Sequence, residues 1–258
     1  MAGSVRTETD ARGVLWITLA RPERKNAFDA TMIGEIATAA RRADAGTRAV
    51  VLASEGDAFC AGADLAWMKG MVEYGLDENL ADSRALADMF MALDDLPMPL
   101  LARVHGAALG GGAGLVAVAD IAIASSEATF GFTEVRLGII PSIVSPYVVR
   151  KIGAGHAGAL FVSGMRFDAR HALEIGLVEA VEAPAELDAK VAFYLDAIAA
   201  SAPKAVIAAK KLVRDIAGRP VSEIREETVR RIAEVRVSDE GQEGMRAFLE
   251  RRKARWMK

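Results

Sequence analysis

Residues 105–114 read HGAALGGGAG and directly follow the apolar stretch LLARV at 100–104. The segment leads from an expected strand into three consecutive glycines that open an apolar helix, expected at 111–119. Glycines let the backbone approach a ligand closely, and the first N–H groups of a helix have no partner inside the helix. This join is therefore suited to hold an oxyanion, which points to an enzyme.

A long apolar stretch, residues 98–124, surrounds the join and invites comparison with a membrane helix. Arg103, His105 and Asp120 would then lie in hydrocarbon, and the glycines would weaken an isolated span. We therefore expect a buried strand, turn and helix, and no membrane partner. Nucleotide phosphates are also disfavoured, because neither G-x-x-x-x-G-K-[ST] nor a correctly spaced G-x-G-x-x-G occurs.

The composition excludes several classes of protein. The 258 residues are 52% hydrophobic and 26% charged, enough for one large domain or one domain with an appendage. A formal net charge of −3 argues against a nucleic-acid partner, which requires a basic surface. Cys60 is the single cysteine and there are three histidines, so no disulfide and no metal site are expected. The N-terminal residues lack the apolar core of a secretory signal, and we expect a cytoplasmic protein.

Apolar stretches of strand length alternate with helical stretches over most of the chain, which predicts an α/β protein with parallel strands. Strands are expected at 14–20, 48–54, 100–104, 120–125 and 178–183, and helices at 30–44, 77–95 and 111–119. The remaining chain is expected to be helical, at 186–201, 203–217, 222–237 and 239–253.

A second loop, AFCAGADL at 58–65, follows the buried strand at 48–54. Gly62 allows the backbone to turn so that the N–H of Ala63 points outward. Alone, this is either a ligand loop or a tight turn. Combined with the glycines at 110–112, it predicts two N–H donors that converge on one oxygen, an oxyanion hole. His105, beside the glycines, is interpreted as a hydrogen-bonded structural imidazole rather than a group that reaches the site.

Glu134 lies in ATFGFTEVRLGIIP, residues 128–141, among apolar neighbours. A single carboxylate in this setting is either a structural residue, paired for example with Arg136, or an acid/base group in an apolar pocket. The residues by themselves leave both interpretations open.

These stretches resemble the enoyl-CoA hydratase/isomerase (crotonase) superfamily, and the resemblance covers nearly the whole chain. It also includes LARPERKNAFD at 19–29, FDARHALEIGLV at 167–178 and EGMRAFLERRKARW at 243–256. The resemblance implies a spiral of repeated β-β-α units over about residues 1–190. It further implies a helical C-terminal segment, 191–258, that assembles a trimer or a dimer of trimers. Apolar helix positions such as Ile232, Val235, Met245 and Phe248 fit that role.

The resemblance also implies roles for individual residues. Ala63 and Gly111 would supply the N–H groups that bind the thioester oxygen, and Glu134 would be a catalytic carboxylate. The substrate would be an acyl-CoA thioester, so coenzyme A arrives with the substrate and no separate cofactor is expected. Contacts with CoA or the acyl group are expected from Arg24, Lys25, Ala27, Ala61, Asp64, Leu65, Lys69, Arg84, Phe248 and Arg251.

One position departs from the family. Where two-glutamate hydratases carry their other carboxylate, in GGGxE, this chain has Gly114. Hydration needs a proton taken from water and a proton delivered to carbon, whereas a double-bond shift needs only one carboxylate as a shuttle. This difference favours an isomerase that uses Glu134 alone. A catalytically silent acyl-CoA-binding protein is a further alternative.

The flanking sequences favour a hydratase instead. GADLAWMKGM at 62–71, DENLADSRALADM at 77–89 and EVRLGIIPSIVSPYVVRKIG at 134–153 resemble bacterial hydratases of branched glutaconyl-type thioesters, including methylglutaconyl-CoA hydratases of leucine breakdown. Such substrates carry a distal carboxylate, for which Lys69 and Arg84 are the candidate partners. We therefore expect a hydratase that adds water across the 2,3 double bond of an enoyl-CoA.

Overall fold

The computed structural model describes residues 3–257, and their contacts divide the chain into two compact units. The first unit contains the residues up to Leu96 together with Leu100–Val191. The second contains Pro97–Pro99 and the residues from Ala192 onward.

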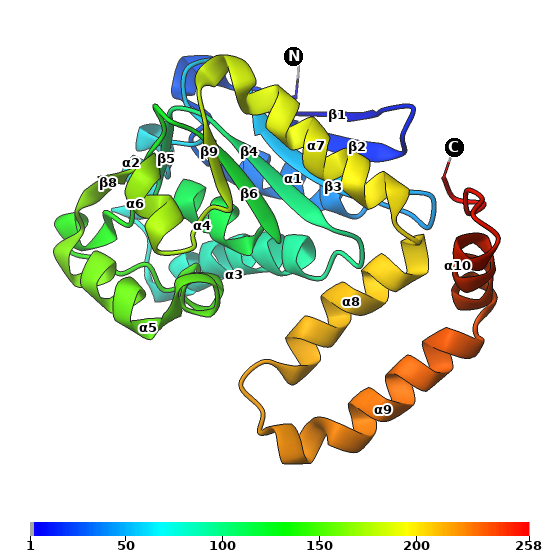
Figure 1. Ribbon diagram of the computed structural model, residues 1–258. Coiled ribbons are helices and arrows are strands. Elements are labelled where there is room, and N and C mark those ends of the chain that lie inside the picture. Colours follow the sequence, from blue (N-terminus) through cyan, green and yellow to red (C-terminus); the bar gives the residue numbers. More distant parts are fainter. Residues whose placement is uncertain (1–2, 258) are drawn as a thin grey trace. The chain divides into compact units, whose positions relative to one another are not determined.

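A six-stranded sheet forms the centre of the first unit (Figure 1). Its strand order is β1-β2-β3-β4-β6-β9, in which β1 and β2 are antiparallel and the other neighbours are parallel. Every residue of β3 is buried, which explains its unbroken apolar sequence. The strands are β1 (Val5–Thr9), β2 (Val14–Leu19), β3 (Ala49–Ser54), β4 (Leu100–Val104), β6 (Ile121–Ser125) and β9 (Ala180–Glu182).

A second, three-stranded sheet has the order β5-β7-β8. Its strands, β5 (Ala107–Leu109), β7 (Thr129–Gly131) and β8 (Arg166–Asp168), are too short for their apolar period to be recognised in the sequence. The chain passes from β4 in the large sheet to β5 in the small one and then into helix α4 (Gly111–Val118). It repeats this path from β6 to β7, which is the expected β-β-α spiral.

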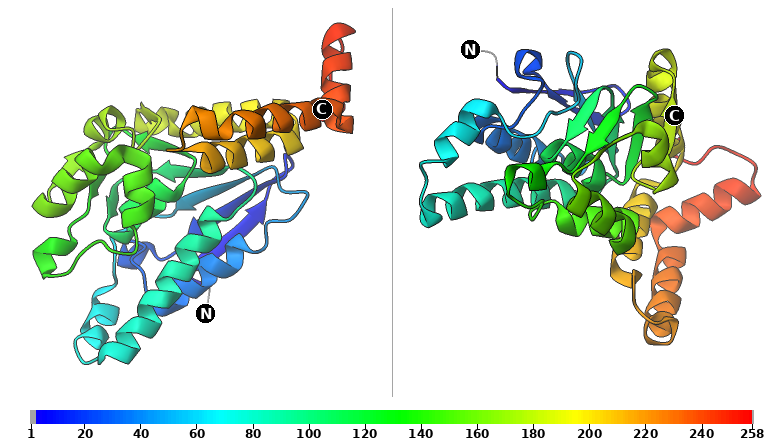
Figure 2. Two further views of the ribbon diagram at one scale, coloured as in Figure 1. Left: turned by 90° about the horizontal axis from the view of Figure 1, so that it is seen from below. Right: turned by 90° about the vertical axis from the view of Figure 1, so that its left-hand side faces the viewer.

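Helices surround the two sheets. α1 (Ala30–Ala40) packs against β1 and β2 and runs beside α3 (Leu76–Asp94), as Figure 2 shows. Asp29 starts α1 by accepting a hydrogen bond from the N–H of Met32 at 2.8 Å. The other helical elements of this part are η1 (Pro22–Arg24), α2 (Leu65–Met71), η2 (Glu134–Leu137), α5 (Ser145–Ser163), α6 (Ala169–Glu174), η3 (Pro184–Glu186) and α7 (Leu187–Ala200).

The second unit is helical and comprises the end of α7, α8 (Pro203–Ile216), α9 (Val221–Val237) and α10 (Asp239–Leu249). The last helix ends at 249, and the expectation of a helix to 253 is wrong. Arg251 adopts a left-handed conformation with φ of 54°, which turns the chain back. Arg252 then reaches the buried carboxylate of Glu243, with N–O distances of 2.7 and 3.0 Å.

Within residues 3–257, no single helix is long and apolar enough to span a membrane, although Pro184–Ala200 and Pro203–Ile216 pass that test as a bent pair. Among the same residues, no group of three or more His, Cys, Asp or Glu side chains is arranged to hold a metal ion.

Candidate active site

The two glycine-containing loops are joined backbone to backbone. The N–H of Cys60 donates to Ala107 O at 2.9 Å, and the N–H of Leu109 donates to Cys60 O at 2.9 Å. A Cβ on Gly106 would lie 2.0 Å from Asp57 O, and one on Gly112 would lie 2.2 Å from Cys60 O. Only glycine fits at 106 and 112, and its absence of a side chain is what lets the two loops meet.

The first expected oxyanion donor is Ala63, in an exposed position. Phe28 forms a parallel bridge with it, because the N–H of Phe28 donates to Gly62 O at 2.7 Å and Phe28 O accepts from the N–H of Asp64 at 2.8 Å. In such a bridge the N–H of the middle residue points away from the partner strand. Gly62, with φ of 94°, makes this turn possible. The N–H of Ala63 therefore faces outward.

The second expected donor is Gly111, the first residue of α4. The helical ladder begins where the N–H of Gly114 donates to Gly110 O at 3.1 Å, so the N–H of Gly111 precedes it. The ring of Phe28 lies beside this residue, since a Cβ on Gly111 would be 2.6 Å from its Cε2. The Cβ position of Gly110 lies 4.0 Å from Cα of Gly62, so the two donor loops come together at one place.

Glu134 lies at the same place. The Cβ position of Gly110 is 3.4 Å from its Oε1. Within residues 3–257, its Oε2 is buried and has no hydrogen-bond partner, and the charge of Arg136 is not among the causes that shift its pKa, so the alternative of a salt bridge with Arg136 is not what the structure shows. Desolvation raises the pKa of the Glu134 carboxyl, and a hydrogen bond from its own backbone N–H only partly opposes this effect. The site thus has two N–H donors and a carboxyl that retains its proton more readily than usual.

Gly114, at the position of the missing carboxylate, lies in a filled space. A Cβ here would be 2.3 Å from Cγ1 of Val144 and 3.0 Å from Cζ of Phe90. Both neighbours are buried, so neither can move into solvent. The structure therefore leaves no room for a second acid at 114.

The expected CoA-binding segment forms a tight turn beside the Ala63 loop. Lys25 O accepts from the N–H of Ala61 at 3.0 Å, which brings the turn of Arg24 and Lys25, both exposed, next to Ala61. Ala27 is buried in the same turn. Asn26, which the sequence reasoning missed, is fully buried with φ of 52°, and its amide anchors the turn. The sequence signal for Asn26 is the residue type alone, because asparagine adopts positive φ more readily than most residues.

Asp64 has a structural role. Its side chain is 4% exposed, accepts from the N–H of Ala66 at 2.8 Å to start α2, and pairs with Arg21 at 3.1 Å. Burial acts to raise its pKa, but the hydrogen bonds from Ala66 and Trp67 and the charge of Arg21 lower it overall. The carboxylate is thus occupied within the chain, which leaves little of it for the substrate contact expected from the sequence.

The remaining predicted contacts are spread over exposed helix surfaces. Leu65 and Lys69 lie on α2 and Arg84 on α3, and all three are exposed. Phe248 and Arg251 belong to the second unit and are also exposed. Their contacts with CoA or the acyl group stay predictions.

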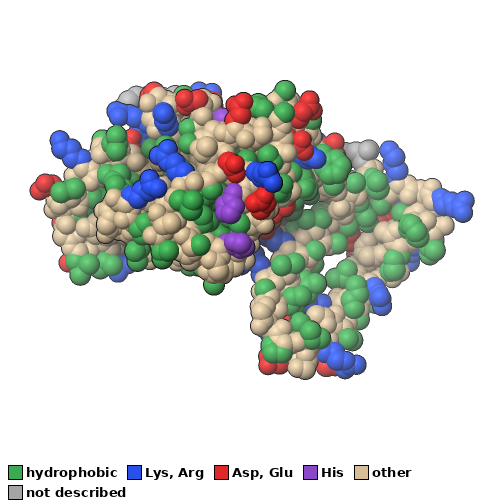
Figure 3. All heavy atoms as spheres, turned by 60° about the vertical axis from the view of Figure 1, so that its left-hand side comes forward, with side chains coloured by type: hydrophobic (Ala, Val, Ile, Leu, Met, Phe, Trp, Pro, Cys, Tyr) green, Lys and Arg blue, Asp and Glu red, His purple; other side chains and the backbone are tan. Residues whose placement is uncertain are grey.

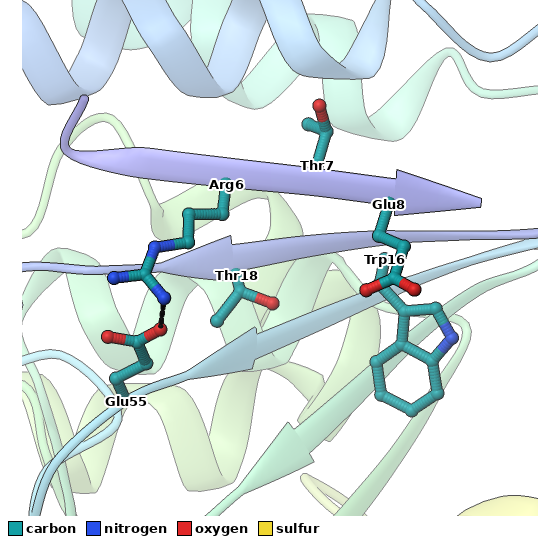
Figure 4. A pocket seen from close by; sticks show the side chains of 6 residues that line it. All are labelled: Arg6, Thr7, Glu8, Trp16, Thr18 and Glu55. Atoms are coloured by element: carbon teal, nitrogen blue, oxygen red, sulfur yellow. Dashed lines mark ion pairs between the residues drawn. The ribbon is translucent and has the colours of Figure 1, made fainter. Parts of the chain in front are cut away.

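A separate hollow of about 360 Å³ lies at the edge of the large sheet (Figure 4). Arg6 and Glu8 of β1 extend toward Trp16 and Thr18 of β2, and Arg6 pairs with Glu55 at 2.6 Å. Thr7 points to the opposite side of the strand. These residues are distinct from the group formed by Ala63, Gly111 and Glu134.

The sequence model of the enoyl-CoA hydratase/isomerase family matches residues 9–258, so the chain belongs to this family. It is an enzyme of that family, and its fold is that of the crotonases.

Three similar proteins illustrate the relationship. A Legionella pneumophila protein assigned as an enoyl CoA hydratase/isomerase (crotonase) is 40% identical with a TM-score of 0.95, over 99% of this chain and 100% of that one. An enoyl-CoA hydratase from Shewanella pealeana is 36% identical with a TM-score of 0.93, over 98% of this chain and 96% of its own. A probable enoyl-CoA hydratase of Rhizobium meliloti is 36% identical over 252 residues, covering 96% of this chain and 95% of its own.

Proposed function

We propose that this enzyme is a hydratase that adds water across the 2,3 double bond of an enoyl-CoA thioester, with Glu134 as its only acid/base group. The observation that carries this proposal is the position of Glu134. Its carboxyl lies beside Gly110, where the two oxyanion loops meet, and its Oε2 is buried without a partner among residues 3–257.

One carboxyl can serve both proton transfers in sequence. The ionised Glu134 removes a proton from water as the water oxygen bonds to C3, and the electron pair of the double bond moves toward the thioester oxygen. The N–H groups of Ala63 and Gly111 stabilise the resulting enolate oxygen. The Glu134 acid then delivers the proton to C2 and the thioester carbonyl re-forms. No electrons leave the substrate, so this reaction needs no cofactor beyond the CoA that the substrate carries.

Isomerisation of a 3-enoyl-CoA is the second candidate. The filled space at Gly114 favours it, because a double-bond shift requires only a carboxyl that moves one proton from C2 to C4 on the same face. The two reactions share the enolate and differ in whether water takes part.

For the hydratase we propose a branched glutaconyl-type substrate, whose distal carboxylate Lys69 and Arg84 would bind. Support comes from the exposed cations on α2 and α3, the two helices that follow the Ala63 loop. Lys69→Gln and Arg84→Gln should raise the KM for 3-methylglutaconyl-CoA and leave that for crotonyl-CoA unchanged. Equal KM changes for both thioesters would contradict this assignment.

We also propose that the second unit assembles a trimer or a dimer of trimers, in which Phe248 and Arg251 contact the CoA of a neighbouring subunit. Hydrophobic side chains are visible at the surface of the helices of the second unit (Figure 3). Exposed apolar residues here include Val229, Ile232, Val237, Met245, Phe248 and Leu249. Sedimentation at micromolar concentration should give a trimer or hexamer, and a monomer would contradict the proposal.

The deciding experiment is an assay with crotonyl-CoA, 3-methylglutaconyl-CoA and a 3-enoyl-CoA, following the absorbance of the conjugated thioester. Loss of absorbance indicates hydration, and a gain indicates isomerisation. Binding of CoA esters without turnover of any would show a silent binding protein and overturn both enzymatic assignments.

A further inference from the structure

Two side chains hold the loop that leads from β3 to the Ala63 donor. Asn26 donates through Nδ2 to Glu55 O and to Ala58 O, each at 2.8 Å. His105 contacts Gly56 O through Nε2, at 2.9 Å. Consecutive carbonyl groups of the loop are therefore oriented by one amide and one imidazole, which come from distant parts of the chain.

The contacts of His105 define which tautomer its neutral ring adopts. Its Nδ1 lies 3.2 Å from Nη1 of Arg103, and a guanidinium can only donate. Nδ1 must therefore accept, so the hydrogen of the neutral ring is on Nε2 and points at Gly56 O.

Arg103 is itself fixed. Its Nε donates to the carboxylate of Asp188 in the first turn of α7, and this hydrogen bond lowers the pKa of Asp188. Asp188, Arg103 and His105 thus form a continuous chain of hydrogen bonds that ends on the backbone of Gly56. Arg103 and Asp188 are the charged groups that face the imidazole, and Asp188 is well exposed.

His105 stands where the two donor segments begin. It directly precedes Gly106, β5 and the run to Gly111, while Gly56 begins the run to Ala63. Further along, the pairing of Cys60 with Ala108 holds the same two segments together. The His105 hydrogen bond and this bridge are two separate attachments, and two attachments fix the relative orientation of the segments where one would leave a hinge.

We propose that His105 is a positioning residue that sets the spacing of the Ala63 and Gly111 N–H groups, with Arg103 and Asp188 holding its imidazole in the donating tautomer. The inference rests on the proposed function, because it assigns those N–H groups to a thioester oxygen. His105 does not touch the substrate. Its loss weakens contacts that are strongest in the transition state, so kcat falls while KM changes little.

The test compares His105→Ala, His105→Gln and Arg103→Met with wild type, and uses His156→Ala, an exposed histidine on α5, as the matched control. Steady-state kinetics give kcat and KM for the enoyl thioester that wild type turns over. The carbonyl ¹³C chemical shift of bound [1-¹³C]butyryl-CoA, which cannot react, reports directly on the two N–H donors. Thermal unfolding shows whether each variant is folded.

We expect His105→Ala to lower kcat about 10-fold with KM nearly unchanged and to reduce the ¹³C shift on binding. His105→Gln, which retains a donor, should recover part of both effects, Arg103→Met should give a smaller loss, and His156→Ala none. Folded His105 variants with the wild-type kcat and ¹³C shift would overturn the inference while the proposed function stands. Failure of wild type to bind butyryl-CoA or shift its carbonyl signal would overturn the proposed function and the inference with it.

Discussion

Positions 114 and 134, which we expect to flank the reacting thioester, have opposite surroundings. Gly114 is packed against Val144 and Phe90, with no volume for a side chain. Glu134 has a half-buried side chain whose Oε2 is enclosed but unpaired within residues 3–257. The space around Gly114 is therefore filled, whereas Glu134 is a single poorly solvated acid. This difference supports the proposal that catalysis uses the fixed N–H donors and Glu134 as the one carboxyl.

Loss of an N–H donor should have the largest effect on activity. Gly111→Pro removes one donor N–H, and proline is acceptable at the first position of a helix. Gly111→Ala is the matched control, because its Cβ meets the same Phe28 ring, 2.6 Å away, but its N–H remains. We expect kcat of the proline variant to be about 100-fold to 1,000-fold below that of the alanine variant. Equal kcat values in two folded proteins would place the oxyanion hole elsewhere.

Loss of the Glu134 carboxyl should have the next largest effect on activity. Glu134→Gln keeps the size and polarity of the side chain but cannot transfer a proton, so we expect turnover to fall about 100-fold. CoA-ester binding, measured by calorimetry, should persist because the N–H donors remain. Glu127→Gln, at an exposed glutamate in the turn before β7, is the control and should be fully active. Normal turnover in Glu134→Gln would refute the assignment of the acid/base.

Glu134 should also affect stability in a pH-dependent way. Because burial raises its pKa, the folded protein loses stability as the pH rises from the unfolded pKa through the folded one. Glu134→Gln does not titrate, so its Tm advantage over wild type should grow between pH 4 and neutral pH. A constant Tm difference over this range would show that the carboxyl is solvated as in the unfolded chain.

The close packing around Gly114 can be tested by measuring stability alone. Gly114→Ala places a Cβ 2.3 Å from Val144 Cγ1, and overpacking of this kind costs about 1–3 kcal/mol of unfolding free energy. Adding Val144→Ala removes the closest contact, so the double variant should be more stable than the sum of the single effects predicts. Denaturant titration measures all three proteins. Additive effects would mean that the space beside Gly114 is open.

Glu243 is a carboxyl paired with arginines, unlike Glu134, and its substitution should change activity least. Arg252 and Arg255 hold the pKa of Glu243 at about 2 despite opposing desolvation. Its contribution to stability is present above the unfolded pKa and is lost as the pH falls toward 2. Glu243→Gln should thus flatten the acid side of the stability curve, followed by circular dichroism, with turnover at neutral pH nearly unchanged. A steep acid transition in the variant would contradict this.

The long helices and strands and the close approach of the two glycine-containing loops could be predicted from the amino-acid pattern alone. Strands such as β3 and helices such as α3 are long enough for their apolar pattern to be recognised, and the glycines at 110–112 mark a close backbone approach. Glu134 could be predicted as the catalytic carboxylate only because the resemblance to the crotonases assigns that role to its position.

The partners of the polar side chains became visible only in the folded protein. Asp64 was expected at the substrate, yet Arg21 and the start of α2 occupy it, and His105 proved to be hydrogen-bonded to a distant loop. The missing volume at Gly114 comes from Phe90 and Val144, which are remote in sequence. The type of a long element can be predicted because the period with which side chains change face is set by residues near one another in the sequence. Burial, pairing and free volume depend on residues that meet only after the chain has folded.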